Sequence, residues 1–201
     1  MIVSDPPASF YFDLSSPEAY LAAERILQVL PGPAEWQPVL LRELPGAGGV
    51  APSSRDEGEA FRAGIASRAQ QLGLQPLRWP QPFPFDSGLA MRVATYAKSI
   101  GRTVPFAQAA FRQAFAGGRD LEQADNVLIA AAACEMHPAA VLRGAELRSV
   151  DRELSAATAH ATRLKISEVP AVSVGELVFL GEFAVEEAAA HISNPSAAVS
   201  R

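Results

Sequence analysis

The stretch Phe10-Tyr11-Phe12-Asp13-Leu14-Ser15-Ser16-Pro17-Glu18-Ala19-Tyr20 decides the fold. Apolar side chains alternate as far as Leu14, which predicts a half-buried β-strand. Two serines, a proline and an acid follow at once, which is the pattern of a helix N-terminus. A strand that runs into a helix leaves backbone N–H groups and the positive end of the helix dipole at one edge of a sheet. A serine hydroxyl at that edge either caps the helix or stabilises a bound anion.

Ser16 has both interpretations. As a cap it precedes Pro17, and proline is favoured at the first helical position. The spacing Ser15-x-x-Glu18 also fits a capping box, and a cap made by Ser15 would leave Ser16 available to a ligand. Because caps are far commoner than active sites, the local pattern alone favours capping. Asp13 is likewise either a proton relay beneath the site or, more often for such a residue, a carboxylate paired with nearby backbone.

The composition predicts a globular protein of one core, or one domain with a large insertion. The 201 residues are 49% hydrophobic and 19% charged, with a net charge of −5. The acidic balance argues against nucleic-acid binding. The longest apolar run is too short to cross a membrane, and the N-terminus lacks a signal-peptide pattern. We therefore expect no nucleic-acid or membrane partner.

The cysteine and histidine content excludes two kinds of site. Cys134 is the one cysteine, so neither an intrachain disulfide nor a Cys-x-x-Cys pair can form, and a reducing cytoplasm is the expected compartment. His137, His160 and His191 are scattered without ligand spacing, so no metal is expected.

Periodicity and turn residues predict an order of strand, helix, strand, a long helical block, then strand, strand and helix. Pro38 lacks a backbone donor, so the second strand should lie at a sheet edge or carry a bulge. Residues 126–134 are apolar all round and should form the buried centre of the helical block. The expected strands are 9–14, 36–41 and a 171–180 hairpin with a type II′ turn at Gly175-Glu176; the expected helices are 17–30, 54–72, 87–100, 105–116, 123–134, 138–147, 150–165 and 184–192, with an irregular connection over 75–86.

This order, and the residues that carry it, resemble the thioredoxin-like DsbA family, and within it the branch of 2-hydroxychromene-2-carboxylate isomerase and kappa-class glutathione transferase. The resemblance rests on the opening stretch together with the following segments: Trp36-Gln-Pro-Val-Leu-Leu41, Pro84-Phe85-Asp86-Ser87, Phe115-Ala-Gly-Gly-Arg119-Asp120 and Val169-Pro170-Ala171-Val172. It implies an α/β, thioredoxin-like fold with a large all-helical insertion domain, and a homodimer. The thioredoxin-like domain would comprise residues 9–76 and 164–193, the insertion 77–163, and flexible tails 1–8 and 194–201.

The resemblance also implies a site. Ser16 stands where redox relatives have the first cysteine of their Cys-x-x-Cys pair, and in the named branch a serine there faces the sulfur of glutathione, next to Pro17. Val169-Pro170 resembles the cis-proline loop, whose backbone can pair with a peptide-like ligand as an added strand. Glu182 could supply an acid for the γ-glutamyl amine. Phe183 and Val50 depart from the branch at expected glutathione contacts.

The function that the resemblance implies is that of a glutathione-dependent isomerase or transferase acting on a small hydrophobic or aromatic electrophile. Alternatives are a non-catalytic binding protein and, disfavoured by the missing cysteines, a thiol-disulfide oxidoreductase. An apolar substrate pocket between the domains is a further expectation, although each aromatic residue taken alone is more often part of a core. Its candidate walls are Tyr20, Trp36, Phe83 and Phe85.

Overall fold

The computed structural model describes residues 8–46 and 54–194 of the chain. Its strands are β1 (Ala8–Phe12), β2 (Ala34–Pro38), β3 (Ala171–Val174) and β4 (Leu177–Leu180). They form one mixed sheet in the order β2-β1-β3-β4, in which β1 is parallel to β2 and antiparallel to β3. The two ends of the chain therefore share one sheet, as predicted, and β2 with Pro38 is an edge strand.

The hairpin between β3 and β4 turns at Gly175-Glu176. Gly175 has a φ of 59°, the positive value that the first central residue of a type II′ turn requires and that glycine adopts without a steric cost. The register pairs Val174 with Leu177 across the turn, so the predicted hairpin is confirmed.

The predicted helix over residues 17–30 is two helices, α1 (Pro17–Ala23) and α2 (Ile26–Val29). Helix α1 stops at Glu24, and the Arg25 guanidinium Nε donates to the Leu21 carbonyl across the break. Leu27, which follows the break, is 58% exposed. Tyr20 is buried as expected.

The remaining helices follow the predicted order closely, and the connection over residues 75–86 has no helix or strand. Short helix η1 (Leu41–Glu43) follows β2. The others are α3 (Arg55–Gln71), α4 (Gly88–Ser99), α5 (Thr103–Phe115), α6 (Ala124–Ala132), α7 (Pro138–Ala145), α8 (Arg148–Arg163) and α9 (Ala184–Ser193). Within the described ranges, no helix is long and apolar enough to span a membrane.

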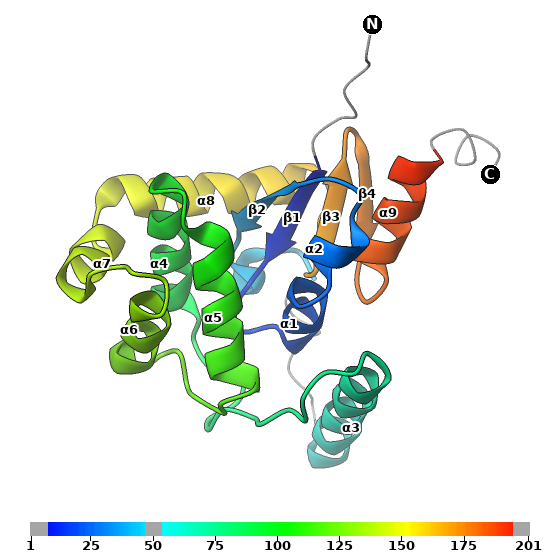
Figure 1. Ribbon diagram of the computed structural model, residues 1–201, viewed down its shortest axis with the longest axis horizontal. Coiled ribbons are helices and arrows are strands. Elements are labelled where there is room, and N and C mark those ends of the chain that lie inside the picture. The colour runs from blue at the N-terminus through cyan, green and yellow to red at the C-terminus, as the bar shows by residue number, and fades with distance from the viewer. Residues whose placement is uncertain (1–7, 47–53, 195–201) are drawn as a thin grey trace, which may run out of the picture.

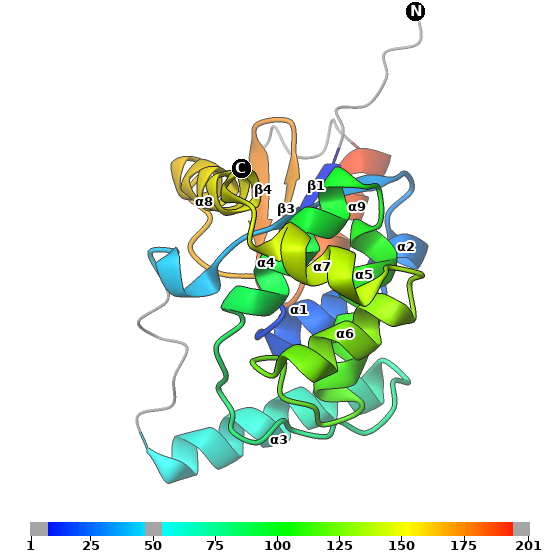
Figure 2. The same ribbon diagram turned by 90° about the vertical axis from the view of Figure 1, so that its left-hand side faces the viewer.

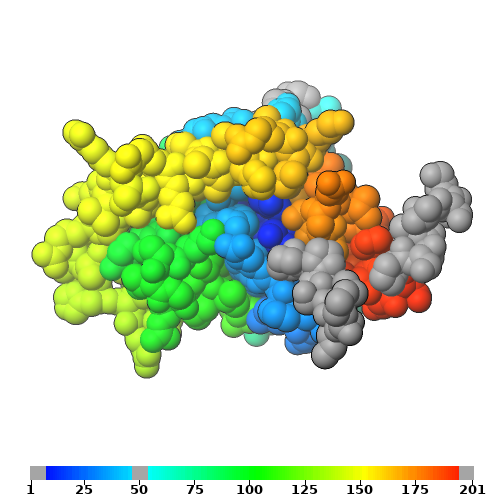
Figure 3. Space-filling view, turned by 90° about the horizontal axis from the view of Figure 1, so that it is seen from above, coloured from blue at the N-terminus to red at the C-terminus, as the bar shows by residue number. Residues whose placement is uncertain are grey.

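The sheet lies between two layers of helices. Helices α1, α2 and α9 lie on one face of the sheet (Figure 1), and in the view turned by 90° α8 lies on the opposite side from α2 and α9 (Figure 2). Seen from above, α8 (yellow) runs from the helical block toward the orange β3–β4 hairpin (Figure 3). Helix α3 lies apart, at the end of the molecule beneath α1, in both ribbon views.

One continuous hydrophobic core joins the sheet to the helical insertion. The Phe12 ring on β1 lies 5.9 Å from the Phe111 ring on α5, and Tyr20 on α1 stacks at 5.7 Å on Phe115. The centre of the insertion is α4 and α5 rather than α6, where Ile129 is 52% exposed. The prediction for residues 126–134 was therefore wrong, because an apolar helix at the periphery buries only one face. The proposed domain boundaries stay a prediction, although Ala8, placed in the N-terminal tail, belongs to β1.

A candidate ligand site at the start of helix α1

Ser16 is the N-cap of α1. Its Oγ accepts a hydrogen bond from the Ala19 N–H at 3.0 Å, and Pro17 occupies the first helical turn. The alternative in which Ser15 caps the helix was wrong, because the Ser15 hydroxyl donates instead to Asp13. Ser16 is 2% exposed. Capping thus uses one lone pair of the hydroxyl, and its proton and second lone pair are left for other contacts.

The Val169-Pro170 loop lies directly opposite Ser16. The peptide bond between Val169 and Pro170 is cis, and the Val169 carbonyl oxygen lies 3.4 Å from the Ser16 Oγ. These two residues lie 153 positions apart in the chain. The fold therefore brings together the hydroxyl, the helix N-terminus and the strand-like backbone that the sequence assigned to one site.

Glu18 contributes a carboxylate to the same position. Its Oε2 lies 3.1 Å from the Ser16 Oγ and accepts the hydroxyl proton. Burial raises the pKa of the Glu18 carboxyl, and the negative charges of Glu168 and Glu182 raise it further. Sequence reasoning treated Glu18 only as part of a capping box, although an acid in the first turn beside the candidate serine was a visible signal.

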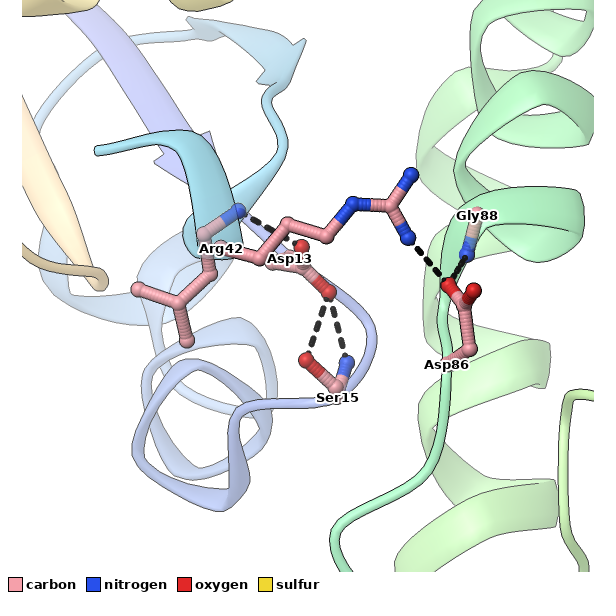
Figure 4. Close-up of polar contacts among 6 residues, drawn as sticks. Asp13, Ser15, Arg42, Asp86 and Gly88 are labelled. Atoms are coloured by element: carbon pink, nitrogen blue, oxygen red, sulfur yellow. Dashed lines mark hydrogen bonds and ion pairs between the residues drawn. The ribbon is translucent and has the colours of Figure 1, made fainter. Parts of the chain in front are cut away.

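Asp13 holds the turn that precedes Ser16, through its hydrogen bonds with Ser15 (Figure 4). One carboxylate oxygen accepts from the Ser15 N–H and hydroxyl, and the other from the Leu41 N–H, each at 2.8 Å. Burial raises the pKa of the Asp13 carboxyl, against the effect of these hydrogen bonds. Asp13 is 1% exposed and ties the turn before α1 to the end of β2, which is the paired, structural interpretation.

One further contact ties this turn to helix α4, and a second ties η1 to the segment just before α4. The Leu14 N–H points to the Met91 Sδ at 3.2 Å. Figure 4 shows the Arg42 side chain reaching Asp86, whose carboxylate also accepts from the Gly88 N–H at 2.7 Å. The backbone before Ser16 is thus fixed to both the sheet and the insertion.

Glu182 lies at the edge of the site but is already paired. Arg68 of α3 approaches the Glu182 carboxylate at 2.8 Å, and its guanidinium lies 4.8 Å from the centre of the Phe183 ring. A ligand amine that binds Glu182 would therefore compete with Arg68 for the carboxylate. Arg68 was missed from the sequence, because nothing in the local pattern of α3 links it to a loop 114 residues later.

Of the four aromatic residues expected in a substrate pocket, Tyr20 and Phe83 both pack against Phe115, with ring centroids 5.7 Å and 6.3 Å away. Trp36 is 2% exposed and packs edge-on against Phe10 at 4.9 Å, so it belongs to the core rather than to a pocket wall. Tyr20 and Phe85 are also buried. Phe83 is half-buried and packs edge-on against Trp79 at 4.8 Å, next to α3. Among the four, Phe83 is the one with appreciable exposed surface.

Two other expectations concern what surrounds the site. Val50, named as a departure from the family, lies outside the described residues. Within residues 8–46 and 54–194, no group of His, Cys, Asp and Glu side chains is arranged to hold a metal ion.

Comparisons with known proteins agree with this fold. A family model described as a DSBA-like thioredoxin domain matches residues 9–193. No curated protein sequence matches the chain.

Solved structures share the fold at low sequence identity. A 2-hydroxychromene-2-carboxylate isomerase structure is 20% identical, covers 96% of this chain and 99% of its own, and has a TM-score of 0.79. A probable DsbA oxidoreductase from Streptomyces coelicolor is 17% identical, with coverages of 98% and 92% and a TM-score of 0.71. The cytosolic disulfide reductase DsbM from Pseudomonas aeruginosa, solved with GSH, is 12% identical, with coverages of 95% and 98% and a TM-score of 0.63. Since the family model spans nearly the whole chain, the protein belongs to the DSBA-like thioredoxin family.

Proposed function

We propose that the chain is a glutathione-dependent isomerase or transferase that acts on a small hydrophobic or aromatic electrophile. The observation that carries the proposal is the position of Ser16: a buried hydroxyl at the N-terminus of α1, 3.4 Å from the backbone oxygen of Val169. A redox member of the family would hold a thiol there. Here the position offers a hydroxyl to the thiol of a bound ligand.

The physical role of this site would be to ionise the glutathione thiol. A free thiol has a pKa of about 8.5, so near neutral pH most of it is protonated and unreactive. The Ser16 hydroxyl and the helix N-terminus both favour negative charge on sulfur. The thiolate would form a bond to the electrophilic carbon of the substrate, and the adduct would then rearrange and expel glutathione, or leave as the product.

The Val169 backbone supports a peptide-like ligand. Within the described part of the chain, the Val169 N–H has no hydrogen-bond partner, and its carbonyl faces Ser16. An extended peptide could bind there as an added strand. Two relatives point the same way: one of the similar structures is named an isomerase of this branch, and another was solved with GSH.

Calorimetric titration with millimolar glutathione, read together with the ultraviolet absorbance of the thiolate, tests the proposal. Wild type should bind and show thiolate at neutral pH, and Ser16→Ala should lose most of the thiolate signal. Ser99→Ala, an exposed serine at the end of α4, is the matched control and should behave as wild type. No binding heat and no thermal shift with wild type would contradict the proposal.

The second candidate, a non-catalytic binding protein, is favoured by one observation. Arg68 and Phe183 occupy the corner where an acid for the ligand amine was expected. Glutathione binding without a thiolate signal, and without turnover of any electrophile, would favour this candidate over the enzyme.

Dithiol oxidoreductase activity is not available to a chain whose one cysteine is the buried Cys134. Insulin-reduction activity in the pure protein would overturn that exclusion. Cytoplasmic location and assembly as a homodimer stay predictions.

A further inference from the structure

Glu18 is a half-buried carboxylate in direct contact with the proposed reactive position, and the mechanism above gives it no role. Its Oε2 lies 3.1 Å from the Ser16 Oγ. The charged groups that face it are Glu168, in the loop before Pro170, and Glu182, after β4, whose charge Arg68 of α3 partly balances. Among the ion pairs of the described residues, none includes Glu18.

A carboxylate in these surroundings holds a proton more readily than one in water. Burial and two like charges disfavour its ionised form, and their effect on the pKa exceeds that of the hydrogen bonds from its own backbone N–H and from Ser16. A thiolate formed beside an ionised Glu18 would add one more negative charge to a poorly solvated position. Thiolate formation is therefore easier if Glu18 becomes neutral at the same time.

The hydrogen-bond capacity of Ser16 allows this exchange. A hydroxyl has one donor and two acceptor positions. The Ala19 N–H fills one acceptor position. When Glu18 is ionised, the hydroxyl proton points to its Oε2; when Glu18 is protonated, its O–H can donate to the Ser16 Oγ and fill the second acceptor position. The hydroxyl proton is then available to the ligand sulfur.

We propose that Ser16 and Glu18 form a proton relay, in which Glu18 is the general base that takes the thiol proton of glutathione; this inference rests on the proposed function. The S–H bond breaks as the thiol proton passes to the Ser16 Oγ and the hydroxyl proton passes to the Glu18 carboxylate. The products are a thiolate and a neutral Glu18, so the net charge is unchanged. After the sulfur bonds to the substrate, the displaced electron pair of the electrophile accepts the proton from Glu18.

The proton count distinguishes this relay from simple stabilisation of a thiolate. If Glu18 keeps the proton, wild-type protein forms thiolate with almost no proton release to the buffer. If the site only stabilises charge, each thiolate releases about one proton. Calorimetric titration with glutathione in buffers of different ionisation enthalpy measures the proton release, and ultraviolet absorbance measures the thiolate.

The variant Glu18→Gln removes the base and keeps the side-chain shape. We expect about one proton released per thiolate formed in this variant, against almost none in wild type. Glu187→Gln makes the same change at an exposed position in the first turn of α9 and should give the wild-type count. Release of about one proton per thiolate from wild type would overturn the relay while leaving the proposed function intact. Absence of glutathione binding, or binding without thiolate, would overturn both.

Discussion

Asp13 and Glu18 lie on either side of Ser16, and burial raises the pKa of both carboxyl groups. They differ in what donates to them. Asp13 accepts from two backbone N–H groups, of Ser15 and Leu41, whose positions the fold fixes. Glu18 accepts from its own backbone N–H and from the Ser16 hydroxyl. The Ser16 hydroxyl can rotate toward another acceptor, the Val169 carbonyl oxygen.

The difference teaches that a carboxylate is structural when backbone donors from separate segments converge on it. It can exchange a proton when its donor from another residue is a hydroxyl that can rotate. Protonating Asp13 would weaken bonds that hold the turn before α1. Protonating Glu18 reverses the direction of its hydrogen bond with Ser16 and weakens the one from its own backbone N–H, and both bonds lie within the start of α1. The four predictions that follow would break or sharpen this contrast.

The largest effect is expected at Asp13. Asp13→Asn keeps the shape but places an N–H₂ group where one backbone N–H needs an acceptor, and we expect a loss of about 2 kcal/mol of unfolding free energy. Urea denaturation measures it. Asp125→Asn, at an exposed position of α6, should stay within about 0.5 kcal/mol of wild type. An equally small loss at Asp13 would mean that its fixed donors contribute little.

Ser16 should come next. Ser16→Ala removes the acceptor of the Ala19 N–H and should cost about 1 kcal/mol, the usual value of a helix cap. Ser16→Thr keeps a hydroxyl and should recover more than half of that loss. The same denaturation experiment checks both variants. Identical stability of the alanine and threonine variants would show that the cap contributes nothing measurable here.

Arg68 tests a third carboxylate, that of Glu182. If Glu182 can bind the ligand amine, Arg68→Met frees it and should tighten glutathione binding by about two- to fivefold, the strength of a partly exposed ion pair. Glu182→Gln should weaken binding. In the Glu182→Gln background, Arg68→Met should leave the glutathione affinity unchanged. A double-mutant cycle, with affinities measured by calorimetry, tests this. Equal tightening in both backgrounds would assign the effect to Phe183 instead.

The smallest effect is expected from Glu18→Gln on stability, and its sign follows from the pKa shift. The folded-state pKa of the Glu18 carboxyl lies above the ordinary value of 4.5. Its ionisation therefore lowers the free energy of unfolding at higher pH. At a pH where the carboxyl is protonated in both the folded and the unfolded protein, it has no such effect. The glutamine variant should therefore be more stable than wild type at pH 7, by less than about 1 kcal/mol. The advantage should shrink as the pH falls toward 4.5. Thermal melting across this range checks it, and a constant difference would contradict the raised pKa.

Much of this arrangement was visible in the sequence because it is local. Alternation as far as Leu14 predicted a strand over residues 9–14, where β1 spans Ala8–Phe12, and the serines with Pro17 predicted the start of α1. The hairpin followed from Gly175. These signals depend on neighbouring residues, whose spacing the sequence displays directly. The family resemblance added that Ser16 and Val169 lie together, which no local pattern contains.

What could not be predicted depends on contacts between distant segments. The choice of Ser16 over Ser15 as the cap depends on Asp13, which holds the Ser15 hydroxyl. The pairing of Glu182 depends on where α3 packs, and the burial of Trp36 depends on β1, whose Phe10 and Phe12 rings pack against it. Periodicity also cannot tell a central apolar helix from a peripheral one, as Ile129 shows.

The continuous core has a consequence for engineering. Deleting the helical insertion to make a minimal thioredoxin-like scaffold would remove Phe111 and Phe115, the rings against which Phe12 and Tyr20 pack. The shortened protein would expose an aromatic patch beside its own ligand site, and such patches promote aggregation. The insertion is therefore not a detachable module, and any transplant of this site must carry α5 with it.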